Sequence, residues 1–224
     1  MVYLLMEITY LGHSCFKLKS KAGLTVYMDP FKSEQVGLPL AKDVADVVTV
    51  SHSHDDHSAV SVITGPVTRP ELFLINREGE YEIAGVQFSA TKTFHDKTKG
   101  SERGKNLVLS IVMDGLHLVH LGDLGDKLSD SQIERLGPID VLMIPVGGTY
   151  TIDAEEAMDI IKDIQPSFVI PMHYKTEASK IEDLAKLEVF LEKNKYPLAG
   201  ESVHKIKVEE NSLPDDTQIL LMNG

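Results

Sequence analysis

The stretch Ser51-His52-Ser53-His54-Asp55-Asp56-His57-Ser58 follows directly on an apolar run at residues 47–50. Its imidazole and carboxylate groups are the side chains that hold Zn²⁺, Mn²⁺ or Fe²⁺ in proteins at neutral pH. Because residues two apart on a strand share a face, His52 and His54 can converge on one ion where the strand ends. A turn after them would carry Asp56 and His57 toward a second ion. The alternative, a solvated loop that is rich in histidine by chance, does not account for this spacing, so we expect a metal site here.

Length and composition predict one soluble globular domain that spans residues 1–224. Hydrophobic residues make up 42% and charged residues 25%, which is ordinary for such a domain. No apolar run approaches the roughly 20 residues that a membrane-spanning helix needs. The run at residues 2–6 is short and lacks a preceding basic region and a cleavage site, so we expect a first strand there rather than a signal peptide. These features together predict a cytoplasmic protein.

The net charge and the single cysteine limit the kinds of partner and of metal site that this chain can have. The formal net charge is −12, whereas a protein that grips an extended nucleic acid usually carries a basic face. A small-molecule substrate, with positive charge supplied locally by metal ions, fits this composition better. Cys15 is the one cysteine of the sequence, which excludes an internal disulfide and a thiolate cluster. Any metal site must therefore be built mainly from nitrogen and oxygen ligands.

Short apolar or alternating runs predict a strand-rich first half of the chain. We expect strands at residues 8–11, 15–18, 25–28, 47–50, 72–75 and 86–91. The Met-Asp-Gly sequence at residues 113–115 predicts a hairpin between strands at 107–113 and 116–121. We expect helices at 129–136, at 154–164 after the N-cap residue Asp153, and at 181–193. Strands that give way to alternating strands and helices favour an α/β layered structure.

Three later strands end in residues that suit a catalytic or metal site. The strand at 88–94 is followed by His95, the strand at 116–121 by Gly122-Asp123, and the strand at 168–172 by His173-Tyr174. Catalytic groups of layered α/β proteins commonly lie where strands end and loops begin. Each of these residues alone could belong to a turn or a packed interior. Their recurrence at strand ends, beside the histidine-rich stretch, predicts that they join one site.

These residues resemble the metallo-β-lactamase superfamily in type and in order. The likeness consists of His52-x-His54-x-Asp56-His57, a single His95, Gly122-Asp123 and His173, with the acidic residue Asp29 before them. The closer resemblance is to the compact, stand-alone branch of small metal-dependent hydrolases related to ascorbate-phosphate lactonase. Four segments carry it: Tyr10-Leu-Gly-His-Ser-Cys-Phe16, Asp29-Pro-Phe31, His120-Leu-Gly-Asp123 and Ile170-Pro-Met-His-Tyr174.

The resemblance implies a four-layer αβ/βα sandwich with a two-metal site at one edge of its sheets. His52, His54 and His95 would hold one ion. Asp56, His57 and His173 would hold the other, and Asp123 would bridge the two. The ions are expected to be Zn²⁺, with Mn²⁺ and Fe²⁺ open, because the ligands are nitrogen and oxygen.

The implied reaction is the hydrolysis of a small ester, lactone or phosphodiester by a metal-bound hydroxide. Asp56, His57 and Asp123 are then the catalytic residues, and no protein nucleophile is needed. Two alternatives use the same fold: an iron-dependent oxidoreductase and a non-catalytic metal-binding module. Iron content with oxygen consumption would favour the first. Loss of ligands would favour the second, whereas this chain retains a full set.

Three residues outside the ligand set are expected near the metals. Asp29 could orient a ligand histidine by a hydrogen bond, although Asp-Pro is also an ordinary turn signal. His13 and His120 resemble family positions close to the metals. A buried, hydrogen-bonded histidine is the alternative, and for His120 we favour it.

Residues of two loops are candidates for substrate contacts. The loop at 96–105 carries a net charge of +2 in a chain of −12, so Arg103, with Lys105 as a second candidate, is expected to anchor an anionic substrate. A solvated hairpin loop is the alternative. Gly147 and Gly148 suggest close backbone approach at the same edge. Tyr150 or Tyr174 could donate a hydrogen bond to a substrate oxyanion, or each could simply pack.

Overall fold

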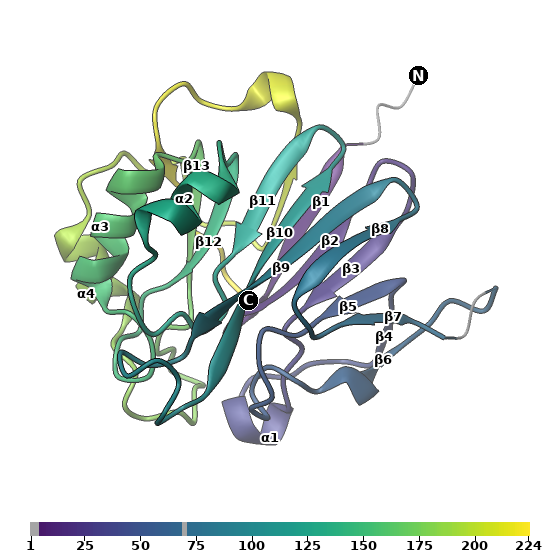
Figure 1. Ribbon diagram of the computed structural model, residues 1–224, viewed down its shortest axis with the longest axis horizontal. Coiled ribbons are helices and arrows are strands. Elements are labelled where there is room, and N and C mark those ends of the chain that lie inside the picture. Colours follow the sequence, from purple (N-terminus) through teal and green to yellow (C-terminus); the bar gives the residue numbers. More distant parts are fainter. Residues whose placement is uncertain (1–4, 69–70) are drawn as a thin grey trace.

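Two β-sheets pack face to face in the computed structural model, which describes residues 5–68 and 71–224 (Figure 1). The first has six strands in the order β14 (Lys205–Val208), β1 (Met6–Gly12), β2 (Cys15–Lys19), β3 (Thr25–Met28), β5 (Val47–Thr49) and β7 (Phe73–Ile75). The second has seven, in the order β15 (Gln218–Ile219), β13 (Phe168–Met172), β12 (Val141–Pro145), β11 (Leu116–His120), β10 (Lys105–Met113), β9 (Val86–Phe94) and β8 (Gly79–Ile83). Residues 2–4 of the predicted first strand lie outside the described residues.

The main core fills the space between the two sheets. In β1, Met6, Ile8 and Tyr10 point into it, and in β10 the odd-numbered residues from Leu107 to Met113 do the same. This alternation follows from the two-residue period of a strand. All five residues of β12 are buried, because both faces of this central strand are covered.

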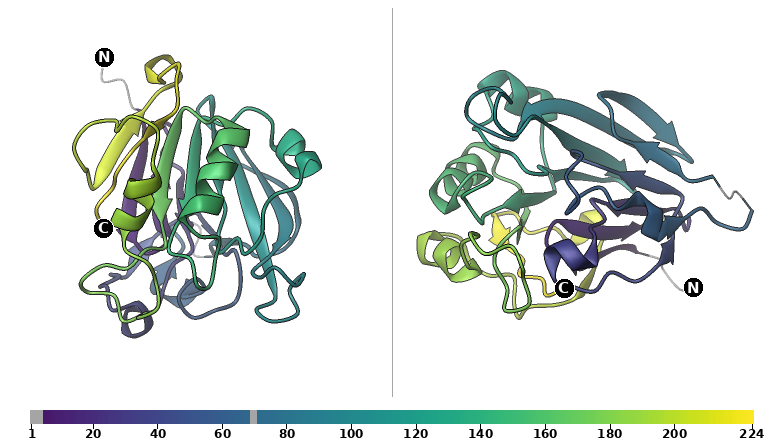
Figure 2. Two further views of the ribbon diagram at one scale, coloured as in Figure 1. Left: turned by 90° about the vertical axis from the view of Figure 1, so that its left-hand side faces the viewer. Right: turned by 90° about the horizontal axis from the view of Figure 1, so that it is seen from below.

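Helices cover the outer face of the seven-stranded sheet (Figure 2). They are α2 (Asp130–Leu136), α3 (Ala154–Ile164) and α4 (Leu187–Lys193). A second core lies beneath them and includes Leu142 and Ile144 of β12 with Ala157 and Ile161 of α3. A third, smaller core lies on the outer face of the six-stranded sheet. There the cover is α1 (Ser33–Val36), a 3₁₀ turn at Val60–Val62 and the short pair β4 (Asp43–Val44) and β6 (Ile63–Thr64). The α/β sandwich expected from the sequence is therefore confirmed.

One predicted helix is wrong in its first part. The apolar pattern at 181–193 predicts a single helix, but α4 begins only at Leu187. Residues before it are used in tertiary contacts: the Ala185 N–H donates to the Gly147 carbonyl, and the Lys175 N–H donates to the Ala185 carbonyl. A backbone that is hydrogen-bonded to other segments cannot also close helical turns. By contrast, α3 has the predicted bounds, and Asp153 caps it by accepting the N–H groups of Glu155 and Glu156.

The strands that carry the candidate ligands end at one edge of the sandwich. The loop after β5 holds the histidine-rich stretch, and His95, Asp123 and His173 follow the ends of β9, β11 and β13. The β1–β2 turn brings His13, and the end of β3 brings Asp29, to the same place. In β11, β12 and β13, which run parallel, the carboxyl ends necessarily lie on one side of the sheet. The topology therefore gathers residues that are far apart in the sequence.

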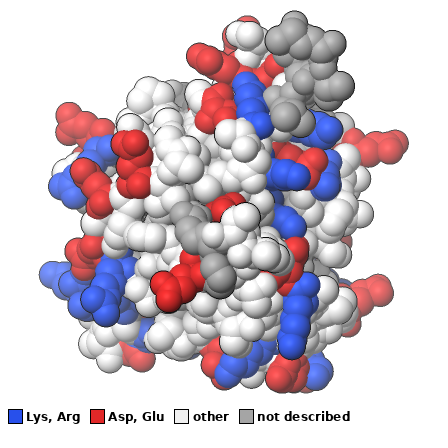
Figure 3. All heavy atoms as spheres, turned by 90° about the vertical axis from the view of Figure 1, so that its right-hand side faces the viewer, with Lys and Arg blue, Asp and Glu red and all other residues white. Residues whose placement is uncertain are grey.

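Charge is mixed rather than grouped on one face of the molecule. On the face shown in Figure 3, the Lys and Arg side chains are interspersed with Asp and Glu. The described residues of this face form no continuous basic stripe of the kind that an extended nucleic acid needs. Among the residues that the structure describes, no helix is both long and apolar enough to cross a membrane.

Candidate metal centre

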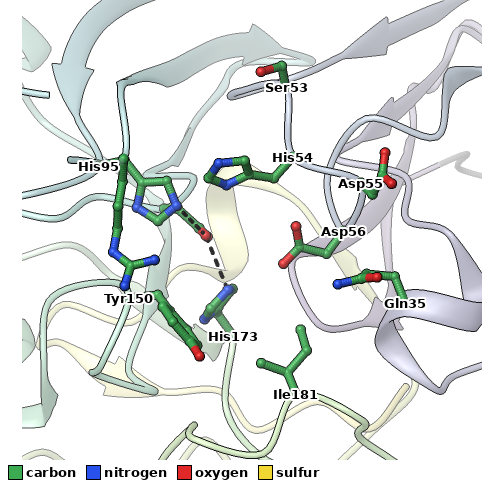
Figure 4. A pocket seen from close by; sticks show the side chains of 11 residues that line it. Gln35, Ser53, His54, Asp55, Asp56, His95, Tyr150, His173 and Ile181 are labelled. Carbon is green, nitrogen blue, oxygen red and sulfur yellow. Dashed lines mark ion pairs between the residues drawn. The ribbon is translucent and has the colours of Figure 1, made fainter. Parts of the chain in front are cut away.

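The predicted ligands converge in three overlapping groups. In each group, every residue offers one potential ligand atom, a ring nitrogen or a carboxylate oxygen, and these atoms all lie within 4.8 Å of one another. The groups are His52, His54 and His95; His13, Asp56, His57 and His173; and His52, His57 and Asp123. The first group is the predicted set for one ion, and the second is the predicted set for the other with His13 added. The third group connects them. Figure 4 shows His54, His95, Asp56 and His173 facing one another across the cavity.

Asp123 lies between the two sets, where a bridging ligand is expected. Its Oδ2 is 3.3 Å from His95 Nε2 on one side and 3.2 Å from His173 Nε2 on the other. Its Oδ1 is 3.2 Å from His57 Nε2. The Asp123 N–H donates to Asn106 Oδ1 at 3.0 Å, which fixes the backbone that carries the carboxylate.

Several buried atoms of this cluster have no hydrogen-bond partner among the described residues. They are His52 Nε2, His57 Nε2, both ring nitrogens of His173, His95 Nδ1 and Asp123 Oδ1. Buried polar atoms almost always have partners, so several atoms without a partner in one cluster indicate an absent ligand. Imidazole and carboxylate donors in this arrangement fit divalent cations bound through nitrogen and oxygen.

Burial and charge prepare these groups for cations. Burial lowers the pKa of His52 to about 3 and that of His13 to about 4, so both imidazoles are neutral and can offer a lone pair. Burial alone would also lower the pKa of His57, but the neighbouring Asp123 and Asp29 carboxylates raise it well above its usual value. The centre therefore attracts positive charge before any ion is bound.

Asp29 supports both sets of ligands. Its Oδ2 accepts a hydrogen bond from His57 Nδ1 at 2.8 Å, which leaves His57 Nε2 directed at the cluster. The same carboxylate accepts from the Ser51 N–H and hydroxyl, and the Ser51 oxygen lies 3.0 Å from His52 Nδ1. Asp29 adopts a left-handed backbone conformation with φ of 44°, which is costly for a residue other than glycine. Bonds of this kind orient ligand histidines in metal sites, and the orienting role of Asp29 stays a prediction.

His13 and His120 differ in what they can do. His13 Nε2 lies 3.2 Å from Asp56 Oδ2 and belongs to the second group of possible ligands, whereas the sequence predicts a place for it outside the ligand set. His120 uses both ring nitrogens elsewhere: Nε2 donates to the Ser14 carbonyl at 2.9 Å, and Nδ1 accepts the Gly122 N–H. No lone pair of His120 remains for an ion, in keeping with the buried, hydrogen-bonded alternative.

A cavity of about 490 Å³ opens over the metal centre. Its lining combines five of the proposed ligands with six other residues, Gln35, Ser53, Asp55, Arg103, Tyr150 and Ile181. In Figure 4, His95 and Tyr150 lie on one side of it, and Gln35 and Asp55 lie on the other. Lys105 is exposed and is not part of this lining.

The two tyrosines are placed differently from each other. Tyr150 lines the cavity, but its hydroxyl donates to Asp183 Oδ2 at 3.1 Å. Tyr174 is not among the lining residues, and its hydroxyl donates to the Met222 carbonyl at 3.2 Å. Both hydroxyl protons are thus engaged within the protein. Gly147 makes the predicted close approach, since a Cβ there would lie 2.0 Å from the His173 carbonyl oxygen.

Some supporting residues carry no recognisable signal in the sequence. Asn106 is 17 residues from Asp123, and Asp183 is 33 residues from Tyr150, so no local motif joins either pair. Asp96, which follows His95, accepts hydrogen bonds from four backbone N–H groups of the next loop. Ser51 is the exception, because it stands at the head of the histidine-rich stretch.

Comparisons with known proteins agree with this geometry. Residues 7–173 match the model of the β-lactamase superfamily domain family. A UPF0173 metal-dependent hydrolase of Methanoculleus marisnigri is 33% identical over 84% of this chain and 89% of its own length. Another from Thermoplasma volcanium is 31% identical over 92% and 97%.

A solved structure is similar over nearly the whole chain. It is a proposed zinc-dependent hydrolase of the metallo-β-lactamase superfamily from Thermotoga maritima, with a TM-score of 0.77 and 34% identity. The match covers 97% of this chain and 98% of that one. The chain therefore belongs to the metallo-β-lactamase superfamily, and within it to the UPF0173 metal-dependent hydrolases.

Proposed function

We propose that this chain is a dinuclear metal-dependent hydrolase that cleaves a small ester, lactone or phosphodiester. One observation carries the assignment: two groups of nitrogen and oxygen donors, most of them buried, meet at Asp123, which lines an open cavity. The names of the relatives, which are metal-dependent hydrolases, support the same reaction class.

In this proposal each ligand has a place. His52, His54 and His95 hold one ion, Asp56, His57 and His173 hold the other, and Asp123 lies between them. His13 lies beside Asp56 and serves either as a further metal ligand or as the hydrogen-bond partner that fixes the Asp56 carboxylate. Two divalent ions so held would lower the pKa of a shared water and polarise the substrate oxygen. Asp56, His57 and Asp123 then serve the reaction by holding and orienting this centre.

The size of the cavity favours a small molecule. Its volume of about 490 Å³ lies within the range typical of small-molecule sites. His54 is exposed, whereas His52 and His57 are buried, so the centre is reached from the side of His54. A substrate that enters there would contact His54 and the partly exposed carboxylate of Asp56.

The test combines metal analysis of the purified protein with a hydrolysis screen. The substrates are bis-p-nitrophenyl phosphate, a set of lactones and a set of thioesters. We expect close to two equivalents of Zn²⁺, Mn²⁺ or Fe²⁺ and turnover of at least one class. Metal content well below one equivalent after loading, or no turnover of any class, would contradict the proposal.

Two ligand variants sharpen the test. His54→Ala should lose one equivalent of metal, and Asp123→Ala should weaken the binding of both metal ions. Each should lower turnover by more than about a hundredfold, because even groups that only support metal ligands can be worth that much. His204→Ala is the matched control, since His204 is exposed and its ring bonds to the Asn223 carbonyl, away from the proposed ligands. Full activity in either ligand variant would remove the two-metal assignment.

A further inference from the structure

Arg103 stands out among the residues that line the metal cavity. It is the one lysine or arginine in that lining, which otherwise includes the carboxylates of Asp55, Asp56 and Asp123. The chain as a whole carries a net charge of −12. A cationic side chain at this position is therefore a local exception, and it faces the same cavity as the proposed ions.

The guanidinium of Arg103 is held in place by stacking, while its hydrogen-bond donors have no partner among the described residues. Its central carbon lies 4.5 Å from the centre of the Tyr150 ring, a stacking geometry that arginine commonly adopts. Tyr150 is fixed in turn by its hydrogen bond to Asp183. No ion pair or hydrogen bond joins the guanidinium to any residue at 5–68 or 71–224. Its N–H groups remain free for a ligand.

The backbone that carries Arg103 is fixed by a buried carboxylate. Asp96 is 7% exposed and accepts the N–H groups of Thr98, Gly100, Glu102 and Arg103, at 2.8 to 3.1 Å, together with the Thr98 hydroxyl. The loop that follows His95 is thus wrapped around one side chain. Lys97 also pairs with Glu156 of α3 at 2.5 Å, which ties the loop to the rest of the fold.

A planar, fixed guanidinium with free N–H groups is suited to a carboxylate or a phosphate, which it can bind through two parallel hydrogen bonds. The reacting end of a substrate would bind at the metal ions. Arg103 would then take a second anionic group, away from the bond that is cleaved.

We propose that Arg103, stacked on Tyr150 and positioned by the Asp96 loop, forms an anion subsite for a carboxylate or phosphate on the substrate. This inference rests on the proposed function, because it places the subsite beside the metal centre. It names the substrate class as a small hydrolysable molecule that carries an anionic group remote from the scissile bond.

The test measures binding to the metal-loaded protein by calorimetry. The probes are butyrate, with one carboxylate, and the α,ω-dicarboxylates from malonate to adipate, which cover a range of spans. A parallel series of phosphonocarboxylates distinguishes a phosphate from a carboxylate at the second group. We expect one dianion length in either series to bind at least about tenfold more tightly than butyrate, as a charged hydrogen-bonded pair allows.

Arg103→Gln should abolish this preference and leave the metal content unchanged, because Arg103 is not one of the proposed metal ligands. Lys99→Gln is the matched control. It removes one positive charge from the same loop, as Arg103→Gln does, but Lys99 is exposed and does not line the cavity. A preference that survives Arg103→Gln, equal losses in both variants, or no preference in the wild-type protein would each overturn the subsite. Failure of the metal centre is separate, since the metal content of the wild-type protein would then be low.

Discussion

At the scale of single residues, the centre depends on one carboxylate that is not itself a proposed ligand. Asp29 bonds directly to His57, in one ligand set, and through Ser51 to His52, in the other. Metal-ligating histidines typically donate their second ring nitrogen to such a partner, which fixes the tautomer and the ring orientation. Here a single side chain supports both sets, so the two ions should not be independent of it.

Asp29→Asn should therefore lower the affinity for both equivalents of metal, by about 10- to 100-fold. The amide has the shape of the carboxylate but gives His57 a poorer acceptor and no charge. Ser51→Ala should cost less and act mainly on the set that contains His52, because the bond between Asp29 and His57 remains. Competition with a chromophoric chelator measures each affinity. Wild-type affinity in Asp29→Asn, or a larger loss in Ser51→Ala, would contradict this role.

At the scale of elements, the sequence pattern predicts the parts whose period is internal to the segment. The bounds of α3, β3 and β13 are as predicted, since apolar runs define all three and the capping residue Asp153 also defines the start of α3. The two-residue strands β4, β6 and β15 carry no such pattern, because a distant partner supplies their hydrogen bonds. The same cause shortens α4, whose predicted first turns bond to the loop at Gly147.

The candidate site divides along the same line. Ligand-type residues follow strand ends, and the chain order of those strands predicts one edge, so the seven proposed ligands could be grouped from the sequence. Contacts of Asn106 with Asp123 and of Asp183 with Tyr150 arise only when separate segments meet. His13 is an intermediate case, because a tight turn places it in the second ligand group.

The N-terminus of α3 offers a test at this scale. Asp153 accepts the Glu155 and Glu156 N–H groups, both at 2.9 Å, and Glu156 returns a bond to the Asp153 N–H. Asp153→Ala should lower the free energy of unfolding by about 1 kcal/mol, because it leaves these N–H groups without their cap. Asp153→Ser, which can still cap, should cost only a fraction of that. Urea denaturation of the two variants measures the difference, and equal stabilities would contradict the capping role.

At the scale of the whole molecule, the metal centre joins the two sheets. His13 and the histidine-rich stretch come from the six-stranded sheet, whereas His95, Asp123 and His173 come from the seven-stranded sheet. The sheets otherwise meet through the apolar core between them. Bound ions would therefore act as a second connection between the layers, added at the side where loops rather than apolar side chains meet.

Removal of metal should accordingly destabilise the fold as a whole. An ion present at about 100 times its dissociation constant stabilises the folded state by about 2.7 kcal/mol. For a chain of this size, such a loss corresponds to a fall in Tm of roughly 5–11 °C, which calorimetry before and after chelation would measure. His54→Ala, with one set impaired, should show a smaller fall, and His204→Ala should show the full one. Because the ligands come from both sheets, hydrogen exchange should increase at the ends of β5 and of β13 together. An unchanged Tm, or faster exchange in one sheet only, would mean that the ions do not join the layers.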